Sequence, residues 1–130
     1  MSDSLYMLSD MNATASIQKF ESRIQQLKAE LTALGEMRPG SRSRQDNVCG
    51  QPNCRCKDPQ NPQRHGPYYQ LSWIHRGQST TQFIRPPLLP QVRAQIARYR
   101  KFRKLTEEWV NLALRQTQAK LLAARRSLAK

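Results

Sequence analysis

Three cysteines and one histidine, close together in the sequence, are the residues best suited to chemistry. Cys49, Cys54 and Cys56 precede His65 in the pattern C-x4-C-x-C-x8-H. Zinc binds thiolate sulfur and imidazole nitrogen as a tetrahedron, and three cysteines with one histidine are a common structural ligand set. The spacing therefore predicts a structural zinc site formed by these four residues, with an iron–sulfur cluster as the less favoured cofactor.

Other interpretations of the same residues stay open. The paired C-x2-C spacing of many zinc sites is absent, so the thiols could be reduced side chains of a loop, with His65 a hydrogen-bonding residue. His75 is an alternative fourth ligand, although a histidine in a strand is more often structural. An odd, clustered set of cysteines is unlike a disulfide framework, and it indicates a reducing compartment such as the cytoplasm.

The cysteines and the histidine belong to two longer motifs. Residues 49–56 form a C-G-x-P-x-C-x-C box, and residues 65–73 form an H-G-P-Y-x-x-x-x-W box. Together they resemble the signature of an uncharacterised family of short prokaryotic proteins, often found among mobile-element genes. The resemblance covers about residues 45–110. It implies a hairpin, a proline-marked turn and a long charged helix after the boxes, together with a role at DNA, but no activity.

The charge of the chain points to a polyanionic partner. Of its 130 residues, 22 are Lys or Arg and nine are Asp or Glu, which gives a formal net charge of +13. Residues 1–37 carry a net charge of −2, residues 38–85 of +6 and residues 86–130 of +9. Because no stretch reaches the roughly 18 apolar residues of a membrane helix, we expect nucleic acid rather than a membrane as the partner.

Basic side chains along the last two thirds of the chain are the expected phosphate contacts. The candidates are Arg42, Arg44, Arg55, Lys57, Arg64, Arg76, Arg93, Arg100, Lys101, Arg103 and Lys104. Helical spacing places Arg93, Arg100 and Lys104 near one face. Tyr68 and Tyr69 are candidates for stacking on unpaired bases, although aromatic residues more often form the core of a small domain. The alternative for the basic residues is a solvated surface.

The elements that must position these residues form an α+β fold that is mostly helical. We expect a flexible tail at residues 1–12 and a coiled-coil helix at 13–37. Residues 38–90 should hold a basic linker, a zinc-knuckle-like Cys/His loop and a β-hairpin. A long basic helix should follow at 91–130, because no Gly or Pro interrupts the chain after Pro90.

Periodicity gives the details of these elements. The first helix carries a heptad seam, formed by Ile17, Phe20, Ile24, Leu27, Leu31 and Leu34. Its flanking charges match only in antiparallel pairing, either with the chain's own last helix or in a homo-oligomer. The strands of the hairpin are expected at 68–75 and 79–85, joined by a turn. The apolar stripe of the last helix shifts near Phe102, which predicts a bend or break there.

Little in the sequence favours catalysis. Nine acids and two histidines are available, and no Gly-rich phosphate loop or nucleophile motif is present. We therefore expect a non-enzymatic DNA-binding protein in the cytoplasm at the nucleoid, accessory to a larger recombination or transposition protein that carries any catalytic residues. The alternatives are an adaptor that docks an acidic protein surface and a protein that binds structured RNA.

Overall fold

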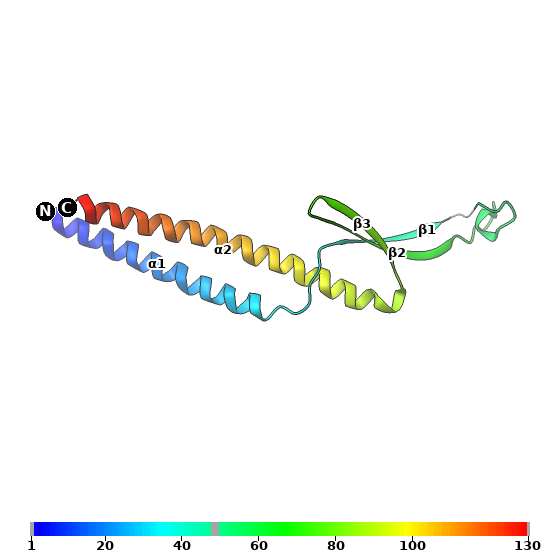
Figure 1. Ribbon diagram of the computed structural model, residues 1–130, viewed down its shortest axis with the longest axis horizontal. Coiled ribbons are helices and arrows are strands. Elements are labelled where there is room, and N and C mark those ends of the chain that lie inside the picture. The colour runs from blue at the N-terminus through cyan, green and yellow to red at the C-terminus, as the bar shows by residue number, and fades with distance from the viewer. Residues whose placement is uncertain (1, 48–49, 130) are drawn as a thin grey trace. The chain divides into compact units, whose positions relative to one another are not determined.

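The computed structural model describes residues 2–47 and 50–129 and shows two long helices and a three-stranded antiparallel sheet (Figure 1). The chain divides into two compact units. Unit 1 comprises Met1–Gly35 and Lys101–Lys130, and unit 2 comprises Glu36–Arg100. The fold is α+β and mostly helical, as the sequence predicts. No helix in the described residues is both long enough and apolar enough to cross a membrane.

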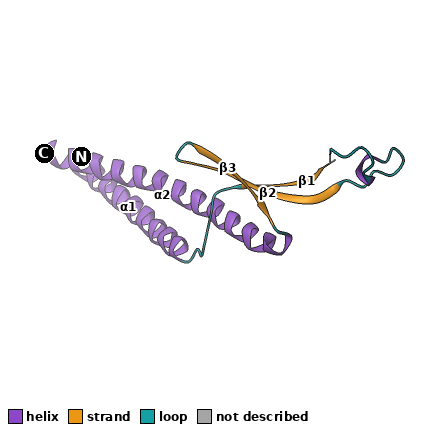
Figure 2. Cartoon of the chain, turned by 45° about the vertical axis from the view of Figure 1, so that its right-hand side comes forward, coloured by secondary structure: helices purple, strands orange, loops and turns teal. Residues whose placement is uncertain are grey.

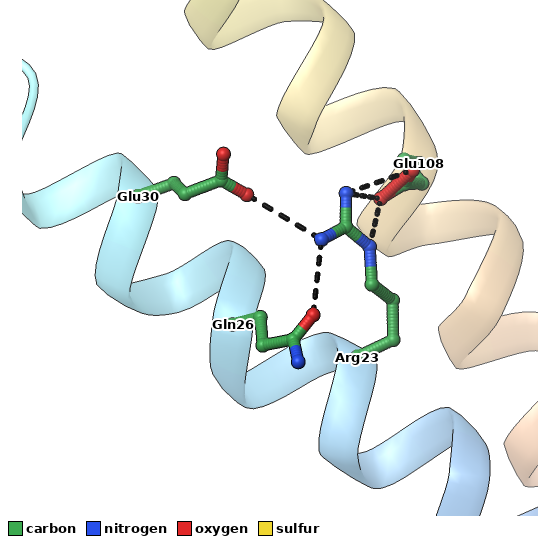
Figure 3. Close-up of polar contacts among 4 residues, drawn as sticks. All are labelled: Arg23, Gln26, Glu30 and Glu108. Atoms are coloured by element: carbon green, nitrogen blue, oxygen red, sulfur yellow. Dashed lines mark hydrogen bonds and ion pairs between the residues drawn. The ribbon is translucent and has the colours of Figure 1, made fainter.

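Unit 1 is an antiparallel pair of helices. Helix α1 spans Ser2–Thr32, and the second helix, α2, spans Leu89–Ala129, of which the part from residue 101 belongs to this unit. Arg23 of α1 bonds to Glu108 of α2, as Figure 3 shows. Earlier in α1, Glu21 accepts a hydrogen bond from the later residue Gln116. The chain's own last helix is therefore the antiparallel neighbour of α1.

The heptad seam of α1 forms the inner side of this pair. Ile24 and Leu27 are buried, and Leu27 has no exposed surface. Leu105 and Gln116 are the buried residues of α2 in unit 1. Seam residues on both helices therefore exclude water along one line, as coiled-coil packing requires.

Both ends of α1 differ from the prediction. The helix begins at Ser2, where the sequence predicted a flexible tail at residues 1–12. The chain has no glycine or proline before Gly35, so nothing local interrupts a helix once its later turns are fixed. It ends at Thr32 rather than at residue 37, and Leu34 donates its backbone N–H to Leu31 in a final turn.

Helix α2 is continuous through Phe102, so the predicted break is wrong. The shift of its apolar stripe instead coincides with the boundary between the units, after Arg100. Val92 and Ile96 belong to the core of unit 2, whereas Leu105 is buried in unit 1. The apolar stripe therefore shifts around the helix axis, because α2 packs against the sheet in unit 2 and against α1 in unit 1.

Unit 2 is built on a sheet with the strand order β1-β2-β3 (Figure 2). Strand β1 spans Ser41–Asn47, β2 spans His65–His75 and β3 spans Gln78–Ile84. The predicted hairpin is β2–β3, and its two turn residues both adopt positive φ, 51° at Arg76 and 77° at Gly77. Such two-residue turns match the twist of the strands that they join.

Strand β1 lies where the sequence predicted an irregular basic linker. Its residues Ser41–Asn47 are polar and have weak strand propensity on their own. They form a strand because the backbone of β2 supplies hydrogen-bond partners, with Arg42 opposite Leu71 and Arg44 opposite Tyr69. The third strand is therefore a tertiary effect that local composition does not show.

The core of unit 2 covers one face of the sheet. Leu71 of β2 and Ile84 of β3 pack with three residues from the first turns of α2, namely Leu89, Val92 and Ile96. Tyr69 and Trp73 pack against the same cluster. A short 3-10 helix, Pro86–Leu88, leads from β3 into α2. Successive strand residues alternate between faces, so the residues between these core positions point away from α2.

Candidate metal centre and basic surface

The structure brings Cys54, Cys56 and His65 together. Their ligand atoms all lie within 4.8 Å of one another, and Cys54 Sγ is 3.1 Å from His65 Nε2. Ligand atoms of a tetrahedral zinc ion, with bonds of about 2.0–2.3 Å, are separated by roughly 3.3–3.8 Å. Cys56 is 2% exposed and the other two residues are partly buried. These three residues, the Cys/His cluster, could therefore hold a metal ion.

A tight turn in residues 50–64, the Cys/His loop, presents the two cysteines. Arg55–Lys57 form a single 3-10 turn, with Cys54 just before it and Cys56 in its middle. The backbone N–H of Lys57 donates to Cys54, and that of Gln63 donates to Arg55 across the loop, each at 3.0 Å. The loop is therefore closed by its own backbone around the cluster.

The end of the sheet presents the histidine. His65 is the first residue of β2 and lies opposite Asn47 of β1. At Gly66, with φ of +119°, an added Cβ would lie 2.9 Å from both Gln45 O and Tyr68 N. Only glycine avoids this contact in such a backbone conformation. The close approach of β1 and β2 therefore fixes the position of His65.

The remaining predicted ligands have different outcomes. Cys49 lies outside the described residues. His75, the alternative ligand, ends β2 ten residues after His65, which is roughly 33 Å along a strand. It therefore cannot join the cluster, and in the described residues the group capable of holding a metal consists of Cys54, Cys56 and His65.

The predicted phosphate-binding residues are all exposed but lie in several places. Arg55 and Arg64 line one open pocket together with Cys54 and His65, and Lys57 ends the neighbouring 3-10 turn. The others are distributed over β1 (Arg42, Arg44), the β2–β3 turn (Arg76), α2 in unit 2 (Arg93, Arg100) and α2 in unit 1 (Lys101, Arg103, Lys104). The structure therefore brings the loop bases together with the Cys/His cluster.

Charge is unevenly balanced in unit 2. Its residues include eleven bases and three acids, whereas unit 1 has eleven bases and six acids. Some of these bases are structural: Arg38 stacks over Trp73 at 4.5 Å, and Arg98 donates to the backbone oxygen of Glu36 at 3.0 Å. Arg44 lies 3.8 Å from Asp46, with both side chains largely exposed. Most of the positive charge of unit 2 therefore faces solvent.

The two tyrosines proposed for base stacking lie on opposite faces of the sheet. Tyr69 packs against the core, so the structure favours a packing role for it. Tyr68 is 42% exposed and makes an edge-to-face contact with Phe83, with ring centroids 6.3 Å apart. Sequence reasoning missed Phe83 and Ile74, which are 64% and 71% exposed. Alternation along residues 78–84 could have found Phe83, because it adjoins the core residue Ile84.

These features define an α+β protein that joins an antiparallel helix pair to a basic sheet unit with a Cys/His cluster. A family model described as a domain of unknown function, DUF6788, matches residues 17–94, and the chain belongs to this family. The match includes the second half of α1, which the two sequence boxes did not include. Comparisons with curated proteins and with solved structures found no match.

Proposed function

We propose that this protein is a non-enzymatic nucleic-acid-binding protein, with DNA as the favoured partner, whose Cys/His loop is held by a structural zinc ion. The observation that carries the proposal is the pocket in which Arg55 and Arg64 lie beside Cys54 and His65. A metal there would hold the chain in a tight loop, and the loop would present its bases to phosphates.

Zinc fits the chemistry of the cluster. Thiolate sulfur and imidazole nitrogen are the ligands of structural zinc sites, which use four protein ligands. Cys49 is the proposed fourth ligand, because it follows Asn47 by two positions and Asn47 pairs with His65. Three thiolates and a neutral imidazole around Zn²⁺ would carry a net charge of −1, which the neighbouring arginines would offset.

The loop also buries little apolar surface of its own. Among residues 50–64, Cys56 is the buried apolar residue. A segment that buries so little apolar surface does not offset the loss of conformational entropy on folding. Because a metal ion binds only the folded arrangement of its ligands, its binding free energy becomes folding free energy.

The bases of the loop suit phosphate recognition. Arg55, Lys57 and Arg64 lie within ten residues of one another and are exposed. Guanidinium groups bind phosphate oxygens in a bidentate manner, and each neutralised phosphate releases counterions. Binding through such contacts should therefore weaken steeply as salt rises.

The biological setting is proposed from the resemblance of the two sequence boxes to proteins encoded among mobile-element genes. In that setting the protein would be an accessory subunit of a recombination or transposition apparatus at the nucleoid in the cytoplasm. It would contribute binding, and a larger recombination protein would contribute the chemistry.

Fluorescence anisotropy tests the proposal. The purified protein is titrated into labelled duplex DNA, single-stranded DNA and RNA at several salt concentrations, and zinc is assayed on the same sample. We expect one zinc ion per chain and an affinity that falls by about a factor of ten or more between 50 and 200 mM salt if several phosphates are contacted. Failure to bind any nucleic acid would contradict the proposal and favour an adaptor that docks an acidic protein.

A charge-matched pair of triple variants locates the contacts. Arg55→Gln/Lys57→Gln/Arg64→Gln removes the loop bases, and Lys19→Gln/Lys120→Gln/Arg125→Gln removes three exposed bases of unit 1. We expect the first variant to bind nucleic acid more weakly. The slope of log affinity against log salt concentration should become shallower, by the amount that about three phosphate contacts contribute. Equal losses in both variants would mean that net charge alone, and not the loop, attracts the nucleic acid.

A further inference from the structure

The face of the sheet that points away from the core, the open face, carries no charged residue. It consists of the residues of Ser41–Gln45, Tyr68–Ile74 and Ser79–Phe83 that are paired across the strands and alternate with the core-facing residues. All ten are Ser, Thr, Gln, Tyr, Phe or Ile. In a chain in which 24% of residues are charged, an exposed sheet face of this size would ordinarily carry Lys, Arg or Glu.

Exposed rings lie on this uncharged surface. Tyr68 and Phe83 contact each other from neighbouring strands, with an interplanar angle of 68°. Ile74 is exposed further along β2. A solvent-exposed group of large apolar side chains marks an interaction surface more often than it serves stability.

Hydrogen-bonding groups surround the rings. The amide of Gln45 donates to that of Gln70 at 3.0 Å, and Ser72 and Thr81 share a hydrogen bond at 3.2 Å. Each amide retains further donor and acceptor capacity, and so does each hydroxyl. The open face therefore combines flat apolar surface with neutral donors and acceptors, as the face and the edge of a nucleobase require.

Positive charge lies at the two ends of the open face. The Cys/His loop, with Arg55 and Arg64, precedes β2, and Arg76 follows it in the turn to β3. Tyr68 comes three residues after His65, or roughly 10 Å along the strand. An uncharged centre with basic ends complements a strand whose bases lie over the centre and whose phosphates lie over the ends.

We propose that the open face binds the unpaired bases of a single-stranded nucleic acid, with Tyr68 and Phe83 stacking on them. This inference rests on the proposed function and specifies its substrate class. Stacking on aromatic rings is available to every base once it is unpaired, and splayed bases also offer their Watson–Crick edges to amides and hydroxyls. Single-stranded DNA and single-stranded RNA share this chemistry.

A duplex would use the open face poorly. In a duplex the faces of the bases are covered by their neighbours, and about half or more of the protein contacts go to phosphate and sugar. The open face has no cationic side chain to meet them, and Phe83 would lie against the sugar–phosphate backbone. The competing occupant is a protein that docks on the open face through apolar contacts. The Phe83 variants described below distinguish this docking from the stacking of bases.

The experiment is an anisotropy titration of the full-length, zinc-loaded protein with labelled twelve-nucleotide oligothymidylate, oligouridylate and a twelve-base-pair duplex. We expect Tyr68→Ala and Phe83→Ala each to weaken binding to the single strands by about tenfold. The salt dependence and the duplex affinity should stay as in the wild type, because no phosphate contact is lost. The ratio of the affinities for oligothymidylate and oligouridylate shows whether the open face prefers single-stranded DNA or single-stranded RNA.

Substitutions at Phe83 separate stacking from apolar docking. Phe83→Leu keeps an apolar side chain without a ring, and Phe83→Trp keeps a ring. Stacking predicts that Phe83→Leu binds single strands as weakly as Phe83→Ala and that Phe83→Trp binds like the wild type. Since Phe83 is 64% exposed, these variants should fold normally, which unchanged circular dichroism and zinc content would verify.

The result that would overturn the inference leaves the proposed function intact. Variants at Tyr68 and Phe83 that bind single strands as tightly as the wild type, in a protein whose nucleic-acid binding still depends on the loop bases, would assign the open face to another partner. Equal losses on duplex and single strands would also overturn it. If Phe83→Leu retains wild-type binding, the contact is apolar docking and not stacking.

Discussion

The two units contain 65 residues each and are held together in different ways. Unit 1 uses two of its acids to join its helices: Glu108 of α2 contacts Arg23 of α1 (Figure 3), and Glu21 of α1 contacts Gln116 of α2. Unit 2 has half as many acids for the same number of bases, and its Cys/His loop has a single buried apolar residue, Cys56. Unit 1 therefore has the character of a self-sufficient scaffold, and unit 2 that of a surface that needs external ligands.

Both units expose apolar residues, but in different settings: those of unit 1, such as Val110 and Leu114, lie along α2, whereas those of unit 2 include residues of the sheet. In unit 1, Leu27 is fully buried in the helix seam. In unit 2, five buried residues form the core on one face of the sheet, while Phe83 and Ile74 on the other face are mostly exposed. On the sheet the exposed Phe83 also contacts Tyr68, and a contiguous apolar patch marks an interaction surface more often than scattered exposed residues do. The comparison can be tested by perturbing each unit separately.

Loss of the proposed zinc ion should have the largest effect, and only on unit 2. In Cys56→Ser we expect loss of bound zinc and local unfolding of residues 50–64, since apparent binding free energies of structural zinc are on the order of 10 kcal/mol. Zinc assay and amide hydrogen exchange measure the two effects. The helical circular dichroism signal, to which unit 1 contributes all of α1 and much of α2, should be largely retained.

Gln60→Ser in the same loop is the matched control, because Gln60 is exposed and is not a ligand. It should keep both the zinc and the slow exchange. If the loop amides of Cys56→Ser exchange as slowly as those of this control, the loop folds without a metal. Unit 2 would then depend on an external ligand no more than unit 1 does.

The second largest effect is expected in the helix seam. Leu27→Ala removes a fully buried side chain, which typically lowers the free energy of unfolding by about 2–5 kcal/mol. Leu114→Ala makes the same chemical change at a side chain that is 63% exposed, so we expect a change within about 0.5 kcal/mol. Urea titration followed by circular dichroism measures both. Zinc content should stay at the wild-type level in both variants, and its loss in Leu27→Ala would show that the units do not fold independently.

The fold could be predicted where local pattern and tertiary structure agree. The heptad seam placed Ile24 and Leu27 in the buried line of α1, and the Arg76–Gly77 pair marked the hairpin turn. Strand β1 could not be predicted, because its partners in β2 lie 18 or more residues away in the sequence and its own residues are polar. The start of α1 at Ser2 was missed because helix formation is cooperative: once the later turns of α1 exist, adding each further residue costs little, whatever its local pattern.

The candidate site was predictable in its ligand types and not in its surroundings. Cys54, Cys56 and His65 lie together, as the donor types and spacing indicated. The faces of β2 were also correct, with Tyr69 and Leu71 on the core side. Phe83 was missed because its role depends on the cross-strand pairing that places Gln70 opposite it and Tyr68 beside it. Register is a property of two strands, so a single run of residues does not contain it.

A smaller effect is expected at the ion pair of unit 1. Arg23 Nη2 lies 2.8 Å from Glu108 Oε2, but the two side chains are 40% and 44% exposed. Exposed pairs contribute about 0.2–1 kcal/mol. We expect Glu108→Gln to lower the urea midpoint slightly at low salt and less at 1 M salt, relative to the exposed neighbour variant Glu107→Gln. A loss that salt does not reduce would indicate packing by the Arg23 side chain and not charge pairing.

The smallest effect concerns acid sensitivity in unit 1. The hydrogen bond from Gln116 Nε2 to Glu21 Oε2, 2.7 Å long, is the main cause that holds the pKa of Glu21 below its ordinary value, and Gln25 adds a second hydrogen bond. Because the pKa is lower in the folded state, this stabilisation is present above the ordinary carboxyl pKa of about 4.3 and is lost as the pH falls through the lowered pKa.

Glu21→Gln should therefore show a smaller fall in melting temperature than the wild type between pH 5 and pH 3. Gln116→Leu should also show a smaller fall, because removing the main hydrogen bond returns the pKa of Glu21 toward its unfolded value, while Glu107→Gln should behave like the wild type. Only the dependence on pH is diagnostic, since the Leu substitution also changes a buried position. If Glu21→Gln and Gln116→Leu both keep the wild-type pH dependence, carboxylates elsewhere cause the loss of stability in acid. The Glu21–Gln116 hydrogen bond would then position the two helices without making the stability of the pair depend on pH.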